Sequence, residues 1–187
     1  MIYPQKLSSK KSDKLVNILL ICSIIIAATL ILINKITSPH TPWAAIANSG
    51  IIYIWITVIY AIKRNTNIAS HVLLQMIAIS FLLIYIDKRL NFQGWSIYIG
   101  VPIVLIVANI TMLVLSIISY ERYTRYAMYQ LIIVILSMIP FILVLRGIIE
   151  LKILNILAIG ISLFNFVLSL ILSYKSFFKM IICKFHI

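Results

Sequence analysis

Residues 95–120 read WSIYIGVPIVLIVANITMLVLSIISY, an apolar run without a single charged side chain. A helix needs about 20 mostly apolar residues to cross the roughly 30 Å of hydrocarbon in a bilayer, so this run predicts a transmembrane helix. Five further runs of the same kind fill most of the remaining chain: residues 15–33, 43–62, 68–86, 127–145 and 153–174. The sequence therefore predicts an all-α, polytopic membrane protein, a bundle of six transmembrane helices.

The composition of the whole chain agrees with this pattern. Of its 187 residues, 63% are hydrophobic and only 11% are charged, and the mean hydropathy is +1.13. Soluble chains carry roughly a quarter charged residues. Strands of a membrane barrel would alternate apolar and polar residues over about ten positions, whereas these runs are continuously apolar. We therefore expect neither a soluble domain nor a barrel.

Lysine and arginine are distributed unevenly between the two predicted sides of the membrane. With six spans, one side receives both termini and the second and fourth loops. That side holds eleven basic residues: Lys6, Lys10, Lys11, Lys14, Lys63, Arg64, Arg122, Arg125, Lys175, Lys179 and Lys184. The other side holds five: Lys35, Lys88, Arg89, Arg146 and Lys152. Because short cytoplasmic loops are enriched in lysine and arginine, both termini are predicted to be cytoplasmic.

Two basic segments flank the predicted membrane domain, which covers residues 15–174. Residues 1–14 form the N-terminal segment, and residues 175–187 form a tail in which lysines are interspersed with Phe177, Phe178 and Ile181. Such a tail is typical of an amphipathic helix in the headgroup region. The net charge of +12 thus indicates membrane lipids as partners rather than nucleic acid, because the basic residues are scattered over short segments.

Polar residues inside the predicted spans mark the helix faces that point into the protein. In the last span Asn155, Ser162, Asn165 and Ser169 lie on one helical stripe, with Ala158 between them. The other candidate interior residues are His71, Gln75, Asn109 and Gln130. Small and amide side chains let helices approach and hydrogen-bond, so helix packing is the favoured interpretation of the stripe. A polar cavity for a substrate is the alternative.

The predicted outer surface carries the densest polar cluster of the chain, which we call the outer rim. Its members are Asp87, Lys88, Arg89, Trp95 and Ser96, together with Trp43 at the start of the second span. Tryptophan is enriched at membrane interfaces, so a solvated loop with aromatic anchors is the favoured interpretation. The functional interpretation is a binding site for a lipid headgroup or a peptide.

The sequence lacks the residues that several kinds of catalysis and ion or metal binding require. No Asp, Glu, Lys or Arg lies near the predicted bilayer centre, which weighs against ion coupling through buried carboxylates. There is no pair of membrane aspartates and no H-E-x-x-H, and the five glycines form no P-loop or Rossmann pattern. Cys22 and Cys183 are too far apart in sequence to make a Cys/His metal cluster. We therefore expect no catalytic residues, no cofactor and no metal site.

Several short motifs resemble those of an uncharacterised bacterial membrane family. They are Tyr3-Pro4 with Lys6 before the first span, Trp43, Gln75, Asp87, and Gly94-Trp95-Ser96 leading to Pro102. Proteins that this chain resembles often carry an N-terminal zinc ribbon ahead of the Tyr-Pro motif. No ribbon cysteines precede Tyr3 here, so no metal-dependent role is carried over. The resemblance covers most of the chain and implies the six-helix fold, but no known activity.

Three functions are compatible with these observations. The leading hypothesis is a non-enzymatic protein of the bacterial cytoplasmic membrane that binds lipid or a partner membrane protein, as an accessory, regulatory or immunity-type subunit. The main alternative is a small transporter or channel that self-associates, with the polar stripes lining a path. An enzyme that modifies lipid at the outer rim is the third.

The uneven basic charge predicts how cysteine probes report the topology. In a variant without Cys22 and Cys183, a membrane-impermeant thiol reagent added outside cells should label Gln93→Cys. It should not label Asn65→Cys or Ser176→Cys until the membrane is opened. The reverse labelling pattern would show that the predicted orientation is inverted.

Overall fold

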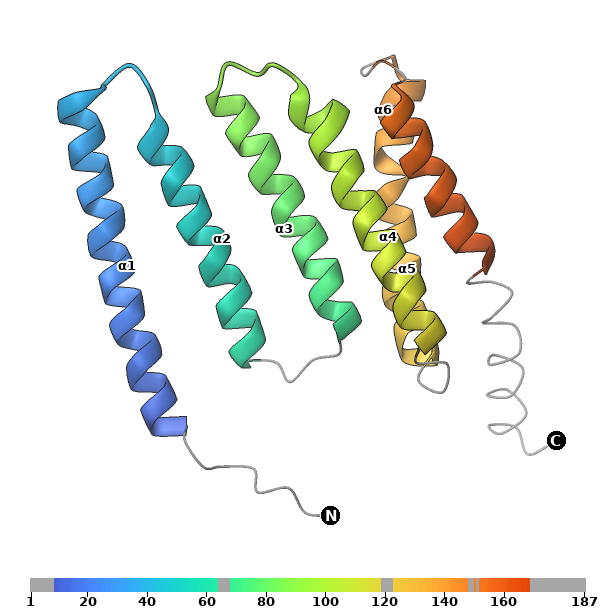
Figure 1. Cartoon of the computed structure of the whole chain (residues 1–187), viewed down its shortest axis with the longest axis horizontal. Coiled ribbons are helices and arrows are strands. Elements are labelled where there is room, and N and C mark those ends of the chain that lie inside the picture. Colours follow the sequence, from blue (N-terminus) through green and yellow to red (C-terminus); the bar gives the residue numbers. More distant parts are fainter. Residues whose placement is uncertain (1–8, 64–67, 119–122, 148–149, 151, 169–187) are drawn as a thin grey trace. The chain divides into compact units, whose positions relative to one another are not determined.

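The computed structural model describes residues 9–63, 68–118, 123–147, 150 and 152–168, and within these residues it is all helical, with no strand. The helices are α1 (Ser9–Thr37), α2 (Trp43–Lys63), α3 (Ile68–Arg89), the π-helix η1 (Ser96–Gly100), α4 (Val101–Ile118), α5 (Tyr123–Ser137), α6 (Ile139–Leu145) and a last helix over Ile153–Leu168 (Figure 1). Counting η1 with α4 and α5 with α6, these are six helical segments at the six predicted positions. The all-α prediction is confirmed.

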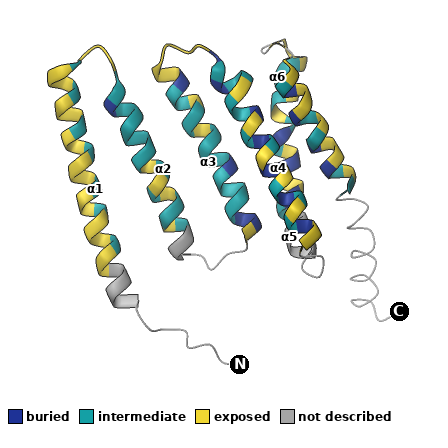
Figure 2. Cartoon of the chain, in the orientation of Figure 1, coloured by how far each residue is buried: buried dark blue, intermediate teal, exposed yellow. Residues whose placement is uncertain are grey.

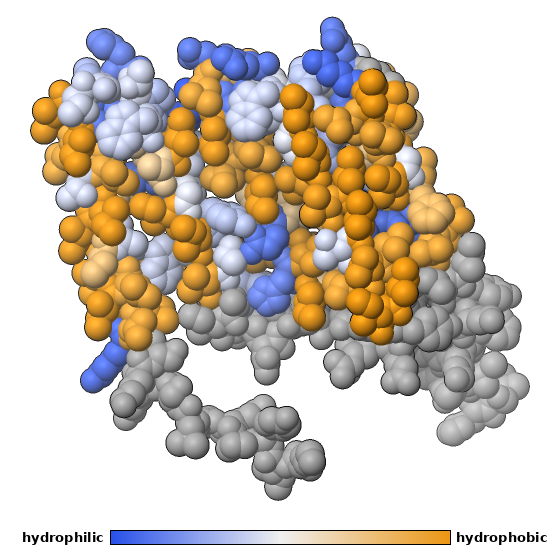
Figure 3. All heavy atoms as spheres, in the orientation of Figure 1, coloured by the Kyte–Doolittle hydropathy of each residue, from blue (hydrophilic) through white to orange (hydrophobic). Residues whose placement is uncertain are grey.

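Four of these helices are long and apolar enough to cross a membrane. They cover Lys14–Thr37, Trp43–Tyr60, Ile68–Arg89 and Ser96–Ile118, while Tyr129–Leu145 and Ile153–Leu168 are shorter apolar helices within the described residues. Apolar side chains cover the helices along their lengths, and hydrophilic side chains gather mainly near the helix ends (Figure 3). This distribution is what a hydrocarbon surrounding requires. Residues 1–8 and 169–187, with Ser169 and the basic tail, lie outside the described residues.

The chain divides into two compact units, Met1–Trp55 and Ile56–Ile187. In the first unit, α1 exposes most of the side chains that are described for residues 14–37 (Figure 2), including Ile18, Ile25 and Leu32. Its contacts with α2 are polar: the indole nitrogen of Trp55 donates to Ser23 Oγ at 2.7 Å. Leucine and isoleucine are as well accommodated by lipid tails as by protein, so polar and close-packing contacts, rather than apolar burial, hold such helices together.

Asn34 closes the connection between α1 and α2. Its Nδ2 donates to the backbone oxygens of Ser38 at 2.7 Å and Thr41 at 2.9 Å. Its Oδ1 accepts the backbone N–H of Ala44, in the first turn of α2, at 2.8 Å. One amide side chain thus satisfies backbone groups of both the loop and the next helix, which an apolar residue would leave unpaired at this helix start.

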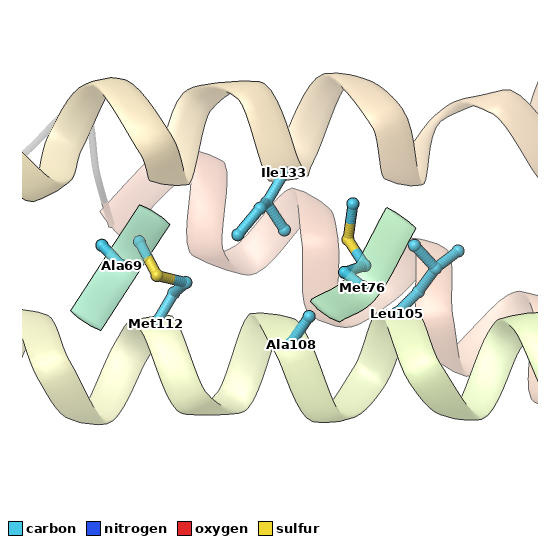
Figure 4. Packing of buried hydrophobic residues seen from close by; sticks show 6 residues of the cluster. All are labelled: Ala69, Met76, Leu105, Ala108, Met112 and Ile133. Atoms are coloured by element: carbon cyan, nitrogen blue, oxygen red, sulfur yellow. The ribbon is translucent and has the colours of Figure 1, made fainter. Parts of the chain in front are cut away.

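The second unit is built around a small apolar core. Its buried members are Ala69 and Met76 from α3, Leu105, Ala108 and Met112 from α4, and Ile133 from α5. Figure 4 shows these side chains meeting between the three helices. On α4 the buried residues recur every three or four positions, so one face of the helix points inward. The opposite face exposes Ile103, Val107, Ile110 and Val114.

The entry into α4 is a π-turn rather than an α-turn. The backbone N–H of Val101 bonds to Ser96 O, five residues earlier, and η1 packs against α3 and α4. Gly94 precedes the turn with a φ of +79°, a conformation that side chains with a Cβ rarely adopt. A Cβ on Gly100 would come within 3.0 Å of Leu83 Cδ1, so the absence of a side chain lets η1 approach α3.

The predicted fifth span, residues 127–145, contains a local interruption of one residue. α5 ends at Ser137 and α6 starts at Ile139, with Met138 in a turn between them. Pro140 lies in the first turn of α6. Proline has no N–H and its ring clashes with the carbonyl four residues earlier, so an unbroken helix through this position is disfavoured.

The close approach at Gly100 predicts a stability difference between two glycine variants. Gly100→Val should lower the thermal unfolding temperature in detergent, because overpacking typically costs about 1–3 kcal/mol. Gly160→Val is the matched control, since Gly160 is exposed on a helix and a Cβ there has no neighbour within 4 Å. Equal unfolding temperatures for the two variants would contradict the tight packing of η1 on α3.

Candidate functional site

The most polar part of the interior lies where α4, α5 and the helix Ile153–Leu168 meet, and we call it the amide seam. Its members are Asn109 and Ser116 of α4, Gln130 and Ser137 of α5, and Ser162 and Asn165 of the last helix. All six are at most 1% exposed. Within each helix the members are three or seven residues apart, so each set lies on one helical face.

Asn109 is the centre of the seam. Its Nδ2 lies 2.9 Å from Leu105 O in its own helix. The same nitrogen lies 3.0 Å from Ser137 Oγ and 3.1 Å from Ser162 Oγ, so its two hydrogens are shared among oxygens of three helices. The hydroxyls of Ser137 and Ser162 donate hydrogen bonds to backbone oxygens one turn earlier, Ile133 O and Ala158 O.

Asn165 and Gln130 extend the seam along the helices. Asn165 Nδ2 donates to Asn109 O at 2.8 Å and lies 3.3 Å from Asn109 Oδ1. Gln130 Nε2 donates to Asn165 O at 3.3 Å, and its Oε1 accepts from Ser116 Oγ at 3.1 Å. The bonds link each of the three helices to the other two. In apolar surroundings such bonds contribute about 0.6 kcal/mol each on average, and more is lost when a partner is left unpaired.

The chemistry of the seam is that of helix packing. Its members are neutral amides and hydroxyls, which neither titrate near neutral pH nor act as nucleophiles without a base. Most of their donors and acceptors are used within the seam or on the adjacent backbone. The arrangement therefore fixes the relative depth and rotation of α4, α5 and the last helix.

One interior residue stands apart from this pattern. Asn155 lies on the same face of the last helix as Ser162 and is 1% exposed, yet neither its Nδ2 nor its Oδ1 has a hydrogen-bond partner. Asn165 Oδ1 also lacks a partner. Leaving a buried polar group unsatisfied costs about 1–3 kcal/mol, so such a group requires an explanation.

The outer rim is organised by a buried carboxylate. Asp87 lies in the last turn of α3 and is 0% exposed. Its Oδ1 accepts the backbone N–H of Gln93 at 3.0 Å, and its Oδ2 accepts the Ser96 hydroxyl at 2.8 Å and the Ser96 N–H at 3.4 Å. Ser96 is also 0% exposed. Asp87 therefore ties the end of α3 to the start of η1 and does not face the solvent.

Exposed cations surround this closed loop. Lys88 is exposed, and the guanidinium carbon of Arg89 lies 5.1 Å from the centre of the Tyr85 ring, with Nε donating to the Tyr85 hydroxyl at 3.1 Å. From the next loop, Lys152 Nζ lies 4.1 Å from the centre of the Tyr98 ring. These contacts orient the two side chains and leave their charges at the surface.

The remaining predicted site residues lie elsewhere. Trp95 is half-buried in the turn before η1, and Trp43 is half-buried at the start of α2 in the first unit. His71 meets the Tyr60 ring edge-on, with ring centres 5.0 Å apart, and the Tyr60 hydroxyl bonds to Ser70. Gln75 Nε2 donates to Thr57 Oγ1 at 3.1 Å. His71 and Gln75 thus belong to the α2–α3 contact and not to the amide seam.

The comparisons with known proteins identify a family. A model described as a family of unknown function, DUF6320, matches residues 3–187, so the chain belongs to this family. The expectation of an uncharacterised family is thereby confirmed, while the zinc ribbon and the bacterial origin stay predictions. No curated protein and no solved structure matches the chain.

The seam predicts how paired substitutions behave. Asn109→Leu and Asn165→Leu should each lower the free energy of unfolding by about 1–3 kcal/mol, because each leaves buried partners unsatisfied. The double variant should lose less than the sum of the two, since the residues bond to each other. Thermal unfolding in one detergent measures all three.

Thr111→Val is the control for these variants. Thr111 is partly exposed on α4, and its hydroxyl donates to Val107 O in its own helix, at 2.7 Å. This variant should unfold within about 0.5 kcal/mol of the parent protein. Strictly additive losses for Asn109 and Asn165 would contradict a shared network.

Proposed function

We propose that this member of the DUF6320 family is a non-enzymatic, multi-pass protein of a bacterial cytoplasmic membrane that binds anionic lipid headgroups at the outer rim. In this role it acts as an accessory or regulatory subunit. The main observation in support is that exposed lysine and arginine side chains lie beside the loop between α3 and η1, which the buried carboxylate of Asp87 holds closed. Four helices of membrane-spanning length and composition support the location.

The hydrogen bonds of Asp87 prepare the rim for binding. A free loop would lose conformational entropy when it closes on a ligand, and a loop already fixed loses less. Residues 90–95 are closed by two backbone N–H bonds and one hydroxyl bond to the same carboxylate. The loop can therefore present Lys88 and Arg89 to a phosphate with little further ordering.

Phosphate is the chemical group that best suits these side chains. The Arg89 guanidinium is a planar donor suited to two-point contact with phosphate, and the ammonium groups of Lys88 and Lys152 add point charges. Tyr85 and Tyr98 lie beneath two of these cations. Aromatic rings with basic neighbours are favoured at headgroup depth. The same surface could recruit an acidic segment of a partner membrane protein, which is the competing outcome.

A transporter or channel is the second candidate, and one observation favours it. Asn155 is buried with an unpartnered amide on the face that also carries Ser162 and Asn165. Polar groups kept inside a membrane protein without protein partners often mark a solute or ion path. Solute flux in liposomes that is lost on Asn155→Leu, with the protein still folded, would favour this candidate over the first.

The headgroup proposal predicts which lipids stay bound after purification. Native mass spectrometry of the detergent-purified protein should show phosphate-bearing anionic lipids. The double variant Lys88→Gln/Arg89→Gln should retain several-fold less of them. Its unfolding temperature should barely change, because exposed charges contribute about 0–1 kcal/mol to stability.

Lys35→Gln is the matched control. Lys35 is a basic residue in the last turn of α1, on the same predicted side of the membrane but outside the rim. It should leave lipid retention unchanged. If the control and the double variant lost equal amounts of bound lipid, the effect would be one of general surface charge. Co-purification of a stoichiometric protein in place of lipid would favour binding of a partner membrane protein.

A further inference from the structure

The junction between η1 and α4 contains one position that cannot donate a backbone hydrogen bond. Val101 N–H bonds to Ser96 O in the π register, and α4 begins at Val101. The backbone N–H of the next residue, position 102, would bond to Ile97 O in a π-helix or to Tyr98 O in an α-helix. This residue is Pro102, which is buried and has no N–H. The helix therefore supplies no hydrogen bond from position 102 to either oxygen.

Asn155 lies at the depth of this junction. Asn109 of α4 bonds to Ser162 of the last helix. Seven positions before these two residues lie Pro102 on α4 and Asn155 on the last helix. Both helices run in the same direction (Figure 1), so Asn155 and Pro102 lie at the same level, two turns before that bond. The contact of Lys152 with the Tyr98 ring independently brings the start of the last helix beside η1.

Helical spacing puts Asn155 on the face of the last helix that meets α4. Seven positions make almost two whole helical turns, so Asn155 shares the face of Ser162, which contacts Asn109. Ala158, between them, is also buried, at 2% exposed. An unpartnered amide and carbonyl oxygens that receive no N–H from Pro102 thus share one depth between these two helices.

The charges at this end of the unit are mixed. The carboxylate of Asp87 is buried and bonded to Ser96, in the first turn of η1, so it adds negative potential close to the junction. The exposed side chains of Lys88, Arg89 and Lys152 oppose a cation there, but water screens exposed charges more effectively than buried ones.

We propose that this junction binds a partly dehydrated alkali cation, sodium or potassium, through oxygen ligands. The ligands are Asn155 Oδ1 and the backbone carbonyls of Ile97 and Tyr98. Broken membrane helices supply carbonyl oxygens to Na⁺ in this manner, and hard cations prefer amide and carbonyl oxygens over nitrogen or sulfur. A cation also accounts for the unpartnered Oδ1 of this buried asparagine. The site is independent of the headgroup proposal.

Thermal unfolding in matched salts tests the site. The purified protein in detergent is measured in sodium, potassium and choline chloride at equal ionic strength. One of the two alkali cations should raise the unfolding temperature by about 3–5 °C over choline when present at roughly ten times its Kd. Identical temperatures in all three salts, as expected if ordered water alone meets Asn155, would overturn the proposal.

Two variants locate the effect. Asn155→Ala should fold, since its amide has no protein partner, and should lose the dependence on the cation. Pro102→Ala restores an N–H to the helix and should weaken the dependence by occupying a carbonyl. Ile156→Ala, at a side chain that is 50% exposed on the same helix, should keep it. A cation dependence that survives in Asn155→Ala would place the bound ion elsewhere and refute this site.

Discussion

A buried polar group without water must find a partner, and this requirement organises the second unit of the protein. The Asn109 amide satisfies it by bonding to oxygens of three helices. In lipid the apolar surfaces of helices gain little from contact with one another, because the tails are equally apolar. The amide seam joins the polar faces of α4, α5 and the last helix, and the apolar core with Met76, Met112 and Ile133 packs between α3, α4 and α5.

The connections between α1 and α2 and between α3 and η1 are closed in the same way. In each, a polar side chain near the end of one helix reaches the first turn of the next: Asn34 to Ala44 and Asp87 to Ser96. Each also bonds to the intervening loop. Backbone groups at helix ends have no partner within the helix, so a side chain that serves both ends closes the turn. The closed loop then becomes a fixed surface on which charges such as Lys88 and Arg89 can act together.

Much of this arrangement was predictable from the sequence. Helix positions follow from apolar runs, and the buried faces follow from the spacing of Asn155, Ser162 and Asn165, because helical periodicity is local information. The break before Pro140 was also readable in principle, since proline removes a donor wherever it stands. The π-turn before Pro102 was not, because it depends on the approach of Gly100 to Leu83 on another helix. The same holds for Asp87, which looked like a solvent-facing rim residue and is buried by its bonds to Ser96 and Gln93.

The central claim is that Asn109 of α4 contacts the last helix at Ser162, and disulfide formation measures this contact directly. In a variant without Cys22 and Cys183, Asn109→Cys combined with Ser162→Cys should cross-link rapidly in membranes under mild oxidant. Thr111→Cys, two positions along α4 and partly exposed, points away from Asn109 around the helix and should not cross-link when paired with Ser162→Cys. Equal cross-linking of the two pairs, or faster cross-linking of the Thr111 pair, would contradict the account.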